Sequence, residues 1–132
     1  MCLSQDTNQS LLFLNESKLN KLKDKIEFSE FLELEKKLEI QVGTVLSVED
    51  VPKSNKLLKL TVQFGSEQRT VVTNIKPHLT DPRGLENRNF LFITNLKPVV
   101  MMGIESTAMI LPGDVEKGIF ITVSGQSGTQ IL

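Results

Sequence analysis

The sequence predicts an all-β fold, a small barrel that follows a helical N-terminal extension. The chain has 132 residues, which is enough for one compact domain with a short appendage. From residue 38 onward, apolar and polar side chains alternate with the period of two expected for half-buried strands. Gly, Pro, Asn and Asp separate these alternating segments and favour turns, whereas the residues before them have helical spacing.

Two helices are predicted in the N-terminal extension. Leu19, Leu22 and Ile26 follow one another at intervals of three and four residues, which places them on one side of a helix. Asn15 or Ser17 could cap the start of this helix, because each offers a side-chain acceptor to the free N–H groups of the first turn.

The second, shorter helix is predicted from residue 30 to about residue 36. Ser29 is the expected N-cap. The apolar side chains of this helix are expected to face a core, and they are those of Phe28, Phe31, Leu32 and Leu34.

Six short strands are predicted after the helices. The first alternates over residues 40–48, and Gly43 marks a position where a strand can bulge or bend. The others are expected at residues 58–64, 69–75, 90–94, 108–111 and 119–123. Residues 80–85 favour a turn or a single helical turn between the third and fourth strands. A five-stranded barrel with a short helix at that place is the OB-fold pattern, and the sixth strand would form a short C-terminal β segment.

The expected domain organisation has three parts. They are a helical linker at 1–34, the OB-fold barrel at 35–112 and a C-terminal β extension at 113–132.

The charge balance excludes one class of nucleic-acid binder. Fifteen basic residues against sixteen acidic ones leave a formal net charge of -1. A protein that coats nucleic acid through bulk charge has a large positive excess, so this class is excluded, whereas a groove with a few placed lysines is not. The chain has seven Phe but no Tyr or Trp, so a base-stacking platform of exposed aromatic side chains is not indicated.

The single cysteine and the single histidine exclude several other functions. Cys2 cannot form an internal disulfide, and structural zinc needs four Cys or His ligands, so we expect no metal and no cofactor. A Ser-His-Asp triad would have to use His78, and no Gly-x-Ser-x-Gly motif lies near it, so the chain is not expected to be an enzyme by itself. The apolar segments are much shorter than the ~20 residues of a membrane helix. We therefore expect a cytoplasmic protein without membrane contact.

Several segments resemble a known family in their order and spacing. They are residues 38–45 (LEIQVGTV), 51–60 (VPKSNKLLKL), 69–72 (RTVV), 95–98 (NLKP), 101–106 (MMGIES) and 108–111 (AMIL). They resemble the tRNA-binding domain that is appended to aminoacyl-tRNA synthetases and that also occurs as a free-standing protein. The version present here is most similar to the C-terminal domain of bacterial methionyl-tRNA synthetase, and residues 11–23 are similar to the linker before that domain.

The resemblance implies a domain that holds tRNA by its shape and backbone without reading a particular sequence. As an appendix of methionyl-tRNA synthetase, it would raise the local concentration of tRNA for aminoacylation. Its partners would be tRNA and the catalytic and anticodon-binding domains of the parent enzyme, and catalysis would lie outside this chain. Two alternatives stay open, a homodimerisation module of the synthetase and a free-standing tRNA-binding or chaperone-like protein.

The strongest candidates for RNA contact lie around the expected second strand. Lys53 and Lys56 precede this strand and Lys59 lies on its polar face, so each could meet a phosphate oxygen. A merely solvated, hydrophilic loop is the alternative interpretation. The full set of candidate RNA-binding residues is Lys53, Ser54, Asn55, Lys56, Lys59, Asn95, Lys97, Met101 and Ser106, with Arg69 and Arg88 as secondary phosphate ligands.

The sequence departs from the family where cations are usual. Relatives often have Arg at the position of Gln41, and Lys or Arg in the loop after Pro98, where this chain has Val-Val-Met-Met. They also tend to have Ser-Gly in place of Thr73-Asn74 and a glycine in place of Ala108. Because these differences remove cations or add bulk, we expect weak, salt-sensitive binding.

The segment after the barrel provides candidates for a dimer contact. The resemblance implies that such domains commonly pair through surfaces in this region. The apolar residues available there are Val115, Ile119, Phe120 and Ile121.

Overall fold

The computed structural model describes residues 22–132. The chain divides into two compact units after Leu34, and each unit is described by itself. Asn15, Ser17 and Leu19, which were expected in the first helix, lie outside the described residues. Leu22 and Ile26 are exposed and precede the first described helix, so the prediction that they belong to a helix is wrong.

Helix α1 spans Phe28–Lys37. The backbone N–H of Glu27 donates to Glu30 Oε1 at 3.1 Å, and the carbonyl of Glu27 accepts from the N–H of Phe31. This is one half of a capping box with Glu27 in the N-cap position. The predicted cap, Ser29, is therefore wrong, because Ser29 lies inside the first turn.

The apolar face of α1 is exposed, so the prediction that it faces a core is wrong. Phe28 is 72% exposed and Leu34 57%, while Phe31 and Leu32 are each 38% exposed. The rings of Phe28 and Phe31 stack on each other with centroids 6.2 Å apart. Helical periodicity identifies an apolar face, but it does not supply a surface to cover that face.

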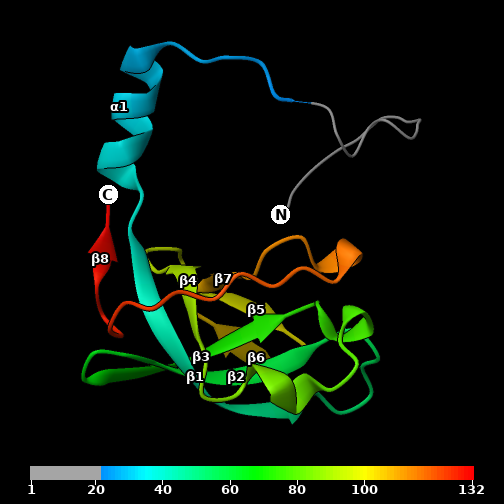
Figure 1. Ribbon diagram of the computed structural model, residues 1–132. Helices are drawn as coiled ribbons and strands as arrows, with labels where there is room; N and C mark the ends of the chain where they lie inside the picture. The colour runs from blue at the N-terminus through cyan, green and yellow to red at the C-terminus, as the bar shows by residue number, and fades with distance from the viewer. Residues whose placement is uncertain (1–21) are drawn as a thin grey trace. The chain divides into compact units, whose positions relative to one another are not determined.

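The second unit is a curled antiparallel sheet, which confirms the predicted OB-like, mostly β fold (Figure 1). Its strands follow the order β3-β2-β1-β4-β7, and β8 pairs with the start of β1, while β5 and β6 form a separate hairpin. The strands are β1 (Ile40–Asp50), β2 (Leu58–Phe64), β3 (Glu67–Thr73), β4 (Asn89–Ile93), β5 (Val99–Met101), β6 (Ile104–Ser106), β7 (Met109–Leu111) and β8 (Gln130–Ile131). Short 3₁₀ turns span Lys76–His78, Pro82–Leu85 and Val115–Lys117.

The core of the barrel consists of alternating side chains from the paired strands. The rings of Phe64 and Phe92 pack edge to face, with their centroids 5.1 Å apart. Val45, Leu60 and Phe90 are fully buried. The bulge in β1 lies between Val45 and Ser47 and not at Gly43, where it was expected. A Cβ on Gly43 would lie only 2.6 Å from the ring of Phe64, so this glycine allows close packing instead.

Ser106, at the end of β6, and Thr107, which follows it, are hydrogen-bonded to β3. The hydroxyl of Ser106 accepts from the N–H of Val72 at 3.0 Å and donates to the carbonyl of Ala108 at 3.1 Å. The N–H of Thr107 donates to the carbonyl of Thr70 at 3.2 Å. These bonds connect the two ends of the curled sheet, where the edge strands β3 and β7 do not pair with each other as a ladder.

The strand expected at residues 119–123 is absent, and that prediction is wrong. The segment is extended and makes isolated hydrogen bonds, from the N–H of Ile121 to the carbonyl of Pro112 at 2.8 Å and from the N–H of Val123 to the carbonyl of Asn89 at 3.0 Å. Phe120 instead packs against the core. The C-terminal β segment is formed later in the chain, by β8.

The β5–β6 hairpin was not predicted, because residues 99–104 are almost uniformly apolar and do not alternate. Its turn residues Met102 and Gly103 have φ values of 49° and 80°. Positive φ at both turn positions is the type I′ geometry that closes two-residue hairpins.

Among the described residues, no helix is long and apolar enough to cross a membrane.

Candidate nucleic-acid interface

The loop between β1 and β2 presents two unpaired lysines. The hydroxyl of Ser54 accepts from the N–H groups of Lys56 at 3.2 Å and Leu57 at 3.1 Å, and the N–H of Ser54 donates to the carbonyl of Val51. These bonds fix the loop, and Val51 is buried. Lys53, Asn55 and Lys56 are exposed. Within residues 22–132 the ammonium groups of both lysines have no ion-pair partner, so they are available to an anion.

Lys59 lies on the outer face of β2, as predicted. Its ammonium group is 3.9 Å from Glu49 Oε1, the residue opposite it on β1, and its side chain is 37% exposed. The neighbouring Lys76 is paired more closely, at 2.8 Å from Asp50 Oδ1. An exposed ion pair is weak, so a phosphate can compete with Glu49 for Lys59.

An open groove of about 680 Å³ lies between the β2–β3 strands and the β5–β6 hairpin. The face of the second and third strands is where OB-folds bind oligonucleotides and oligosaccharides. Two cationic and two anionic side chains line the groove, so its formal charges cancel. The lining residues are Lys59, Glu67, Gln68, Arg69, Thr70, Gly103, Ile104, Glu105 and Thr107.

Asn95 is held by the protein on both sides of its amide. Its Oδ1 accepts from the N–H of Glu39 at 3.0 Å, and its Nδ2 donates to the carbonyl of Lys37 at 2.6 Å. Lys97, two residues further on, is exposed and has no ion-pair partner among the described residues. Of these two predicted contacts, Lys97 is the one whose polar atoms are free.

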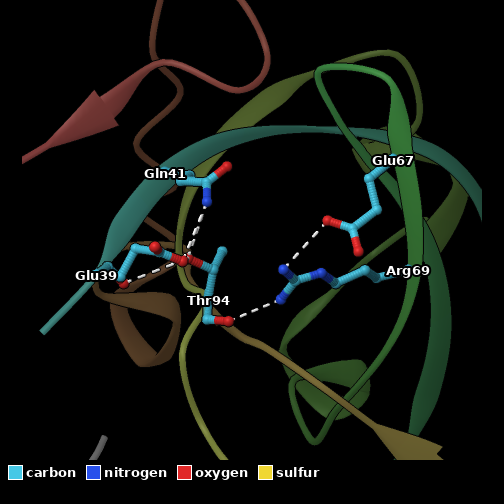
Figure 2. A network of polar contacts seen from close by, with 5 residues as sticks. All are labelled: Glu39, Gln41, Glu67, Arg69 and Thr94. Carbon is cyan, nitrogen blue, oxygen red and sulfur yellow. Dashed lines mark hydrogen bonds and ion pairs between the residues drawn. The ribbon is translucent and has the colours of Figure 1, made fainter.

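The guanidinium of Arg69 is engaged by the protein (Figure 2). Its Nη1 donates to the carbonyl of Thr94 at 2.7 Å and its Nη2 to Glu67 Oε1 at 3.2 Å. The guanidinium carbon lies 5.4 Å from the centre of the Phe64 ring, in cation–π geometry. The side chain of Arg69 is only 21% exposed.

Two further side chains, those of Glu39 and Gln41, continue this network on the other side of Thr94 (Figure 2). The hydroxyl of Thr94 donates to Glu39 Oε1 at 2.5 Å. Gln41 Nε2 donates to the same Glu39 oxygen at 3.1 Å and lies 3.3 Å from the hydroxyl oxygen of Thr94. The bond from Thr94 lowers the pKa of Glu39, and so do the bond from Gln41 and the charge of Arg69, against the opposing effect of burial.

The other predicted contacts differ in accessibility. Ser106 is buried, and both its hydrogen bonds are made within the protein. Met101 is half-buried in β5, whose neighbours Val99 and Val100 are exposed. Arg88 is exposed before β4 and does not line the groove. Whether these residues contact RNA stays a prediction.

The structure brings together only Lys59 and Arg69 of the predicted set in the groove. It adds Gln68, Thr70 and Thr107, which were not predicted. Alternation on β3 could have indicated Gln68 and Thr70 as outward-facing residues. Nothing in the sequence indicated the hairpin that forms the opposite wall.

The predicted dimer residues divide into two pairs. Val115 and Phe120 pack against the barrel core of their own chain. Ile119 and Ile121 point outward and are 50% and 57% exposed.

Within residues 22–132, no group of three or more His, Cys, Asp or Glu side chains could hold a metal ion.

Comparison with known proteins identifies the family. The family described as "Putative tRNA binding domain" matches residues 40–129, which is more than half of the chain. The chain belongs to this tRNA-binding domain family. The resemblance predicted from the sequence motifs is therefore confirmed.

The relatives of this tRNA-binding domain include methionine–tRNA ligases. That of Archaeoglobus fulgidus is 38% identical over 111 residues, which are 83% of this chain but 16% of the ligase. The MetRS-related protein of Pyrococcus horikoshii has a similar structure, with a TM-score of 0.70 and 33% identity over 83% of this chain and 100% of its own. The chaperone CsaA of Bacillus anthracis has a TM-score of 0.63 at 23% identity, over 83% of this chain and 100% of its own, and it shares the fold.

Proposed function

We propose that this domain binds tRNA without reading its sequence. The observation that carries the proposal is the pair of exposed lysines Lys53 and Lys56, which have no ion-pair partner among the described residues, on a loop that precedes the groove strand β2. Lys59 and Lys97 provide two further accessible ammonium groups. Ammonium groups meet phosphates without identifying the base, so this arrangement favours backbone recognition.

The same features suggest that binding is weak. Four phosphate contacts correspond to a slope of about -2.8 in log K against log salt, from about -0.7 per contact with a single strand. Within residues 35–132, no Phe side chain is exposed, so we expect no aromatic stacking on bases in this unit. A neutral groove with a few placed lysines fits micromolar, largely electrostatic affinity.

A weak module is useful when it is tethered. We propose that the domain is an appendix of a methionine–tRNA ligase in the cytoplasm and raises the local concentration of tRNA at the enzyme. Catalysis and anticodon recognition would then belong to other domains of the ligase. In support, the alignment spans 16% of the length of the Archaeoglobus fulgidus ligase, so most of such an enzyme has no counterpart in this chain.

Fluorescence titration of unfractionated tRNA at low and moderate salt tests the proposal. We expect micromolar binding at low salt that weakens steeply as salt is raised. Absence of binding at tens of micromolar protein in low salt would refute it. A ligase gene fused in frame to this sequence would favour the appendix, whereas a complete short gene would favour a free-standing protein, a form compatible with the full-length match to the MetRS-related protein of Pyrococcus horikoshii.

Homodimerisation is a second candidate function, and it is compatible with the first. It is favoured by the exposed Ile119 and Ile121 of the C-terminal segment, which lie beside the inward-facing Phe120. Burial of such side chains in a partner would remove apolar surface from water. Sedimentation velocity over a range of concentrations tests this role: a concentration-independent monomer would exclude it, and Ile121→Asp should dissociate a dimer.

A further inference from the structure

Arg69 lies in the groove proposed for RNA but directs its donors into the protein. Two guanidinium nitrogens are bonded to the carbonyl of Thr94 and to Glu67, and the Phe64 ring lies beside the guanidinium. Thr94 is only 4% exposed. If Arg69 turned toward a phosphate, the carbonyl of Thr94 would lose this partner in a buried place, which is unfavourable.

Thr94 is the residue at which several elements are joined. Arg69 reaches it from β3, and the hydroxyl of Thr94 reaches Glu39, the residue immediately before β1. Its backbone N–H donates to the carbonyl of Glu39 at 3.0 Å. Thr94 is thus bonded through its carbonyl, its amide and its side chain, and Figure 2 shows the bonds to Arg69 and Glu39 on opposite sides of it.

The loop that follows Thr94 begins at a residue whose position is fixed by these bonds. Asn95 bonds to the N–H of Glu39 and to the carbonyl of Lys37, and Pro98 restricts φ at the far end. Only Leu96 and Lys97 lie between these two fixed points. The direction of the Lys97 side chain therefore depends on the position of Thr94 and Asn95.

We infer that Arg69 is a positioning residue that orients the loop of Lys97 for RNA, and that it is not itself a phosphate ligand. Arg69, Thr94, Glu39 and Asn95 together form a polar clasp that joins β3 to the residue before β1 and to the residues that follow β4. The inference rests on the proposed tRNA binding, in which Lys97 meets a phosphate. It replaces the role that the sequence suggested for Arg69 with one that the geometry favours.

The test compares affinity and salt dependence, because the two roles of Arg69 affect them differently. Arg69→Lys keeps the positive charge but removes the planar set of donors that reaches both Thr94 and Glu67. We expect the affinity for unfractionated tRNA to fall about three- to tenfold and the salt slope to shrink by up to about 0.7, since the displaced Lys97 loses its phosphate contact while the charge at position 69 is kept. Arg88→Lys is the matched control on an exposed arginine outside the groove, and it should bind like the wild type.

A double-mutant cycle measures whether Arg69 acts through Lys97. Lys97→Ala should reduce the salt slope by about 0.7 in the wild-type background. In the Arg69→Lys background the same change should have a smaller effect, because the loop is already displaced. Additive effects of the two substitutions, or no effect of Lys97→Ala, would overturn the inference.

Two further results separate the alternatives. If Arg69→Lys binds like the wild type while Arg69→Met loses about 0.7 of the slope, Arg69 is a phosphate ligand and the inference is wrong. If the wild type itself does not bind tRNA, the proposed function fails and the inference fails with it. Binding by the wild type together with unchanged Arg69→Lys affinity overturns the inference alone.

A second variant covers the case in which Arg69→Lys does not fold, as judged by circular dichroism at the assay temperature. Thr94→Val removes the hydroxyl that bonds to Glu39 and should likewise lower the affinity and shrink the salt slope, because Lys97 would again be displaced. Thr94→Ser restores the hydroxyl and should restore binding. Wild-type affinity in Thr94→Val would overturn the inference.

Discussion

Removal of the two unpaired loop lysines is the most direct perturbation of the proposed interface. In the variant Lys53→Ala with Lys56→Ala, two of four accessible ammonium groups are lost, and the loop keeps the bonds of Ser54 to the backbone. The expected slope changes from about -2.8 to about -1.4, since each single-strand contact contributes about -0.7. Between 50 and 200 mM salt, the loss of affinity should therefore shrink from about 50-fold to about sevenfold.

The assay is fluorescence anisotropy of labelled, unfractionated tRNA at several salt concentrations. The matched control is Lys23→Ala with Lys117→Ala, which removes the same number of charges from exposed positions outside the β1–β2 loop and the groove. The control should keep the wild-type slope. If both double variants lower the slope equally, binding depends on net charge and the placement argument is refuted, whereas an unchanged slope in the loop variant would place the RNA path elsewhere.

Three further predictions concern stability, which chemical denaturation measures. Gly43→Ala should lower the free energy of unfolding by about 1–3 kcal/mol, because the new methyl would overlap the rings of Phe64 and Phe92; an unchanged midpoint would contradict this. Ser106→Ala should cost about 1–3 kcal/mol, since it leaves the buried N–H of Val72 without its acceptor, and equal stability would show that another group replaces the hydroxyl. The lowered pKa of Glu39 contributes stability that is fully present above its unfolded-state pKa and is lost as pH falls through the folded-state value. Glu39→Gln should therefore destabilise the protein at neutral pH and reduce the loss of stability on acidification, and parallel pH profiles would disprove the assignment.

The barrel strands were largely predictable, because apolar residues alternate with polar ones along a strand when only one face of the sheet is buried. The segment at 58–64 was predicted with the bounds that β2 has, and its apolar residues are buried while Lys59, Thr61 and Gln63 are not fully covered. The same logic failed at residues 119–123, where Phe120 packs against the core, Ile119 and Ile121 are exposed, and the segment joins no ladder. The alternation of apolar and polar residues indicates which side chains a strand could bury, but it does not indicate whether another strand is available to pair with its backbone.

The interface was only partly predictable for a related reason. Lys53 and Lys56 were predicted because a basic, turn-forming loop is visible in the sequence, and the structure leaves both exposed, while their contact with RNA stays a prediction. The groove wall formed by the β5–β6 hairpin was missed, since its type I′ turn uses Met102 and has no Asn or Asp signal. The polar atoms of Ser106 and Asn95 bond within the protein, and their predicted contact with RNA stays a prediction.

The sequence by itself determined the curled sheet, the loop lysines and membership of the tRNA-binding domain family, because these depend on residue type and spacing along the chain. Tertiary structure alone decided which polar groups are free. Lys97 and Arg69 are both cations in the sequence, but folding leaves Lys97 exposed and brings the carbonyl of Thr94 and the carboxylate of Glu67 to Arg69. The physical reason is that the hydrogen bonds and ion pairs of a polar side chain depend on partners distant in sequence. The alternation of apolar and polar residues along a strand does not indicate which partners these are.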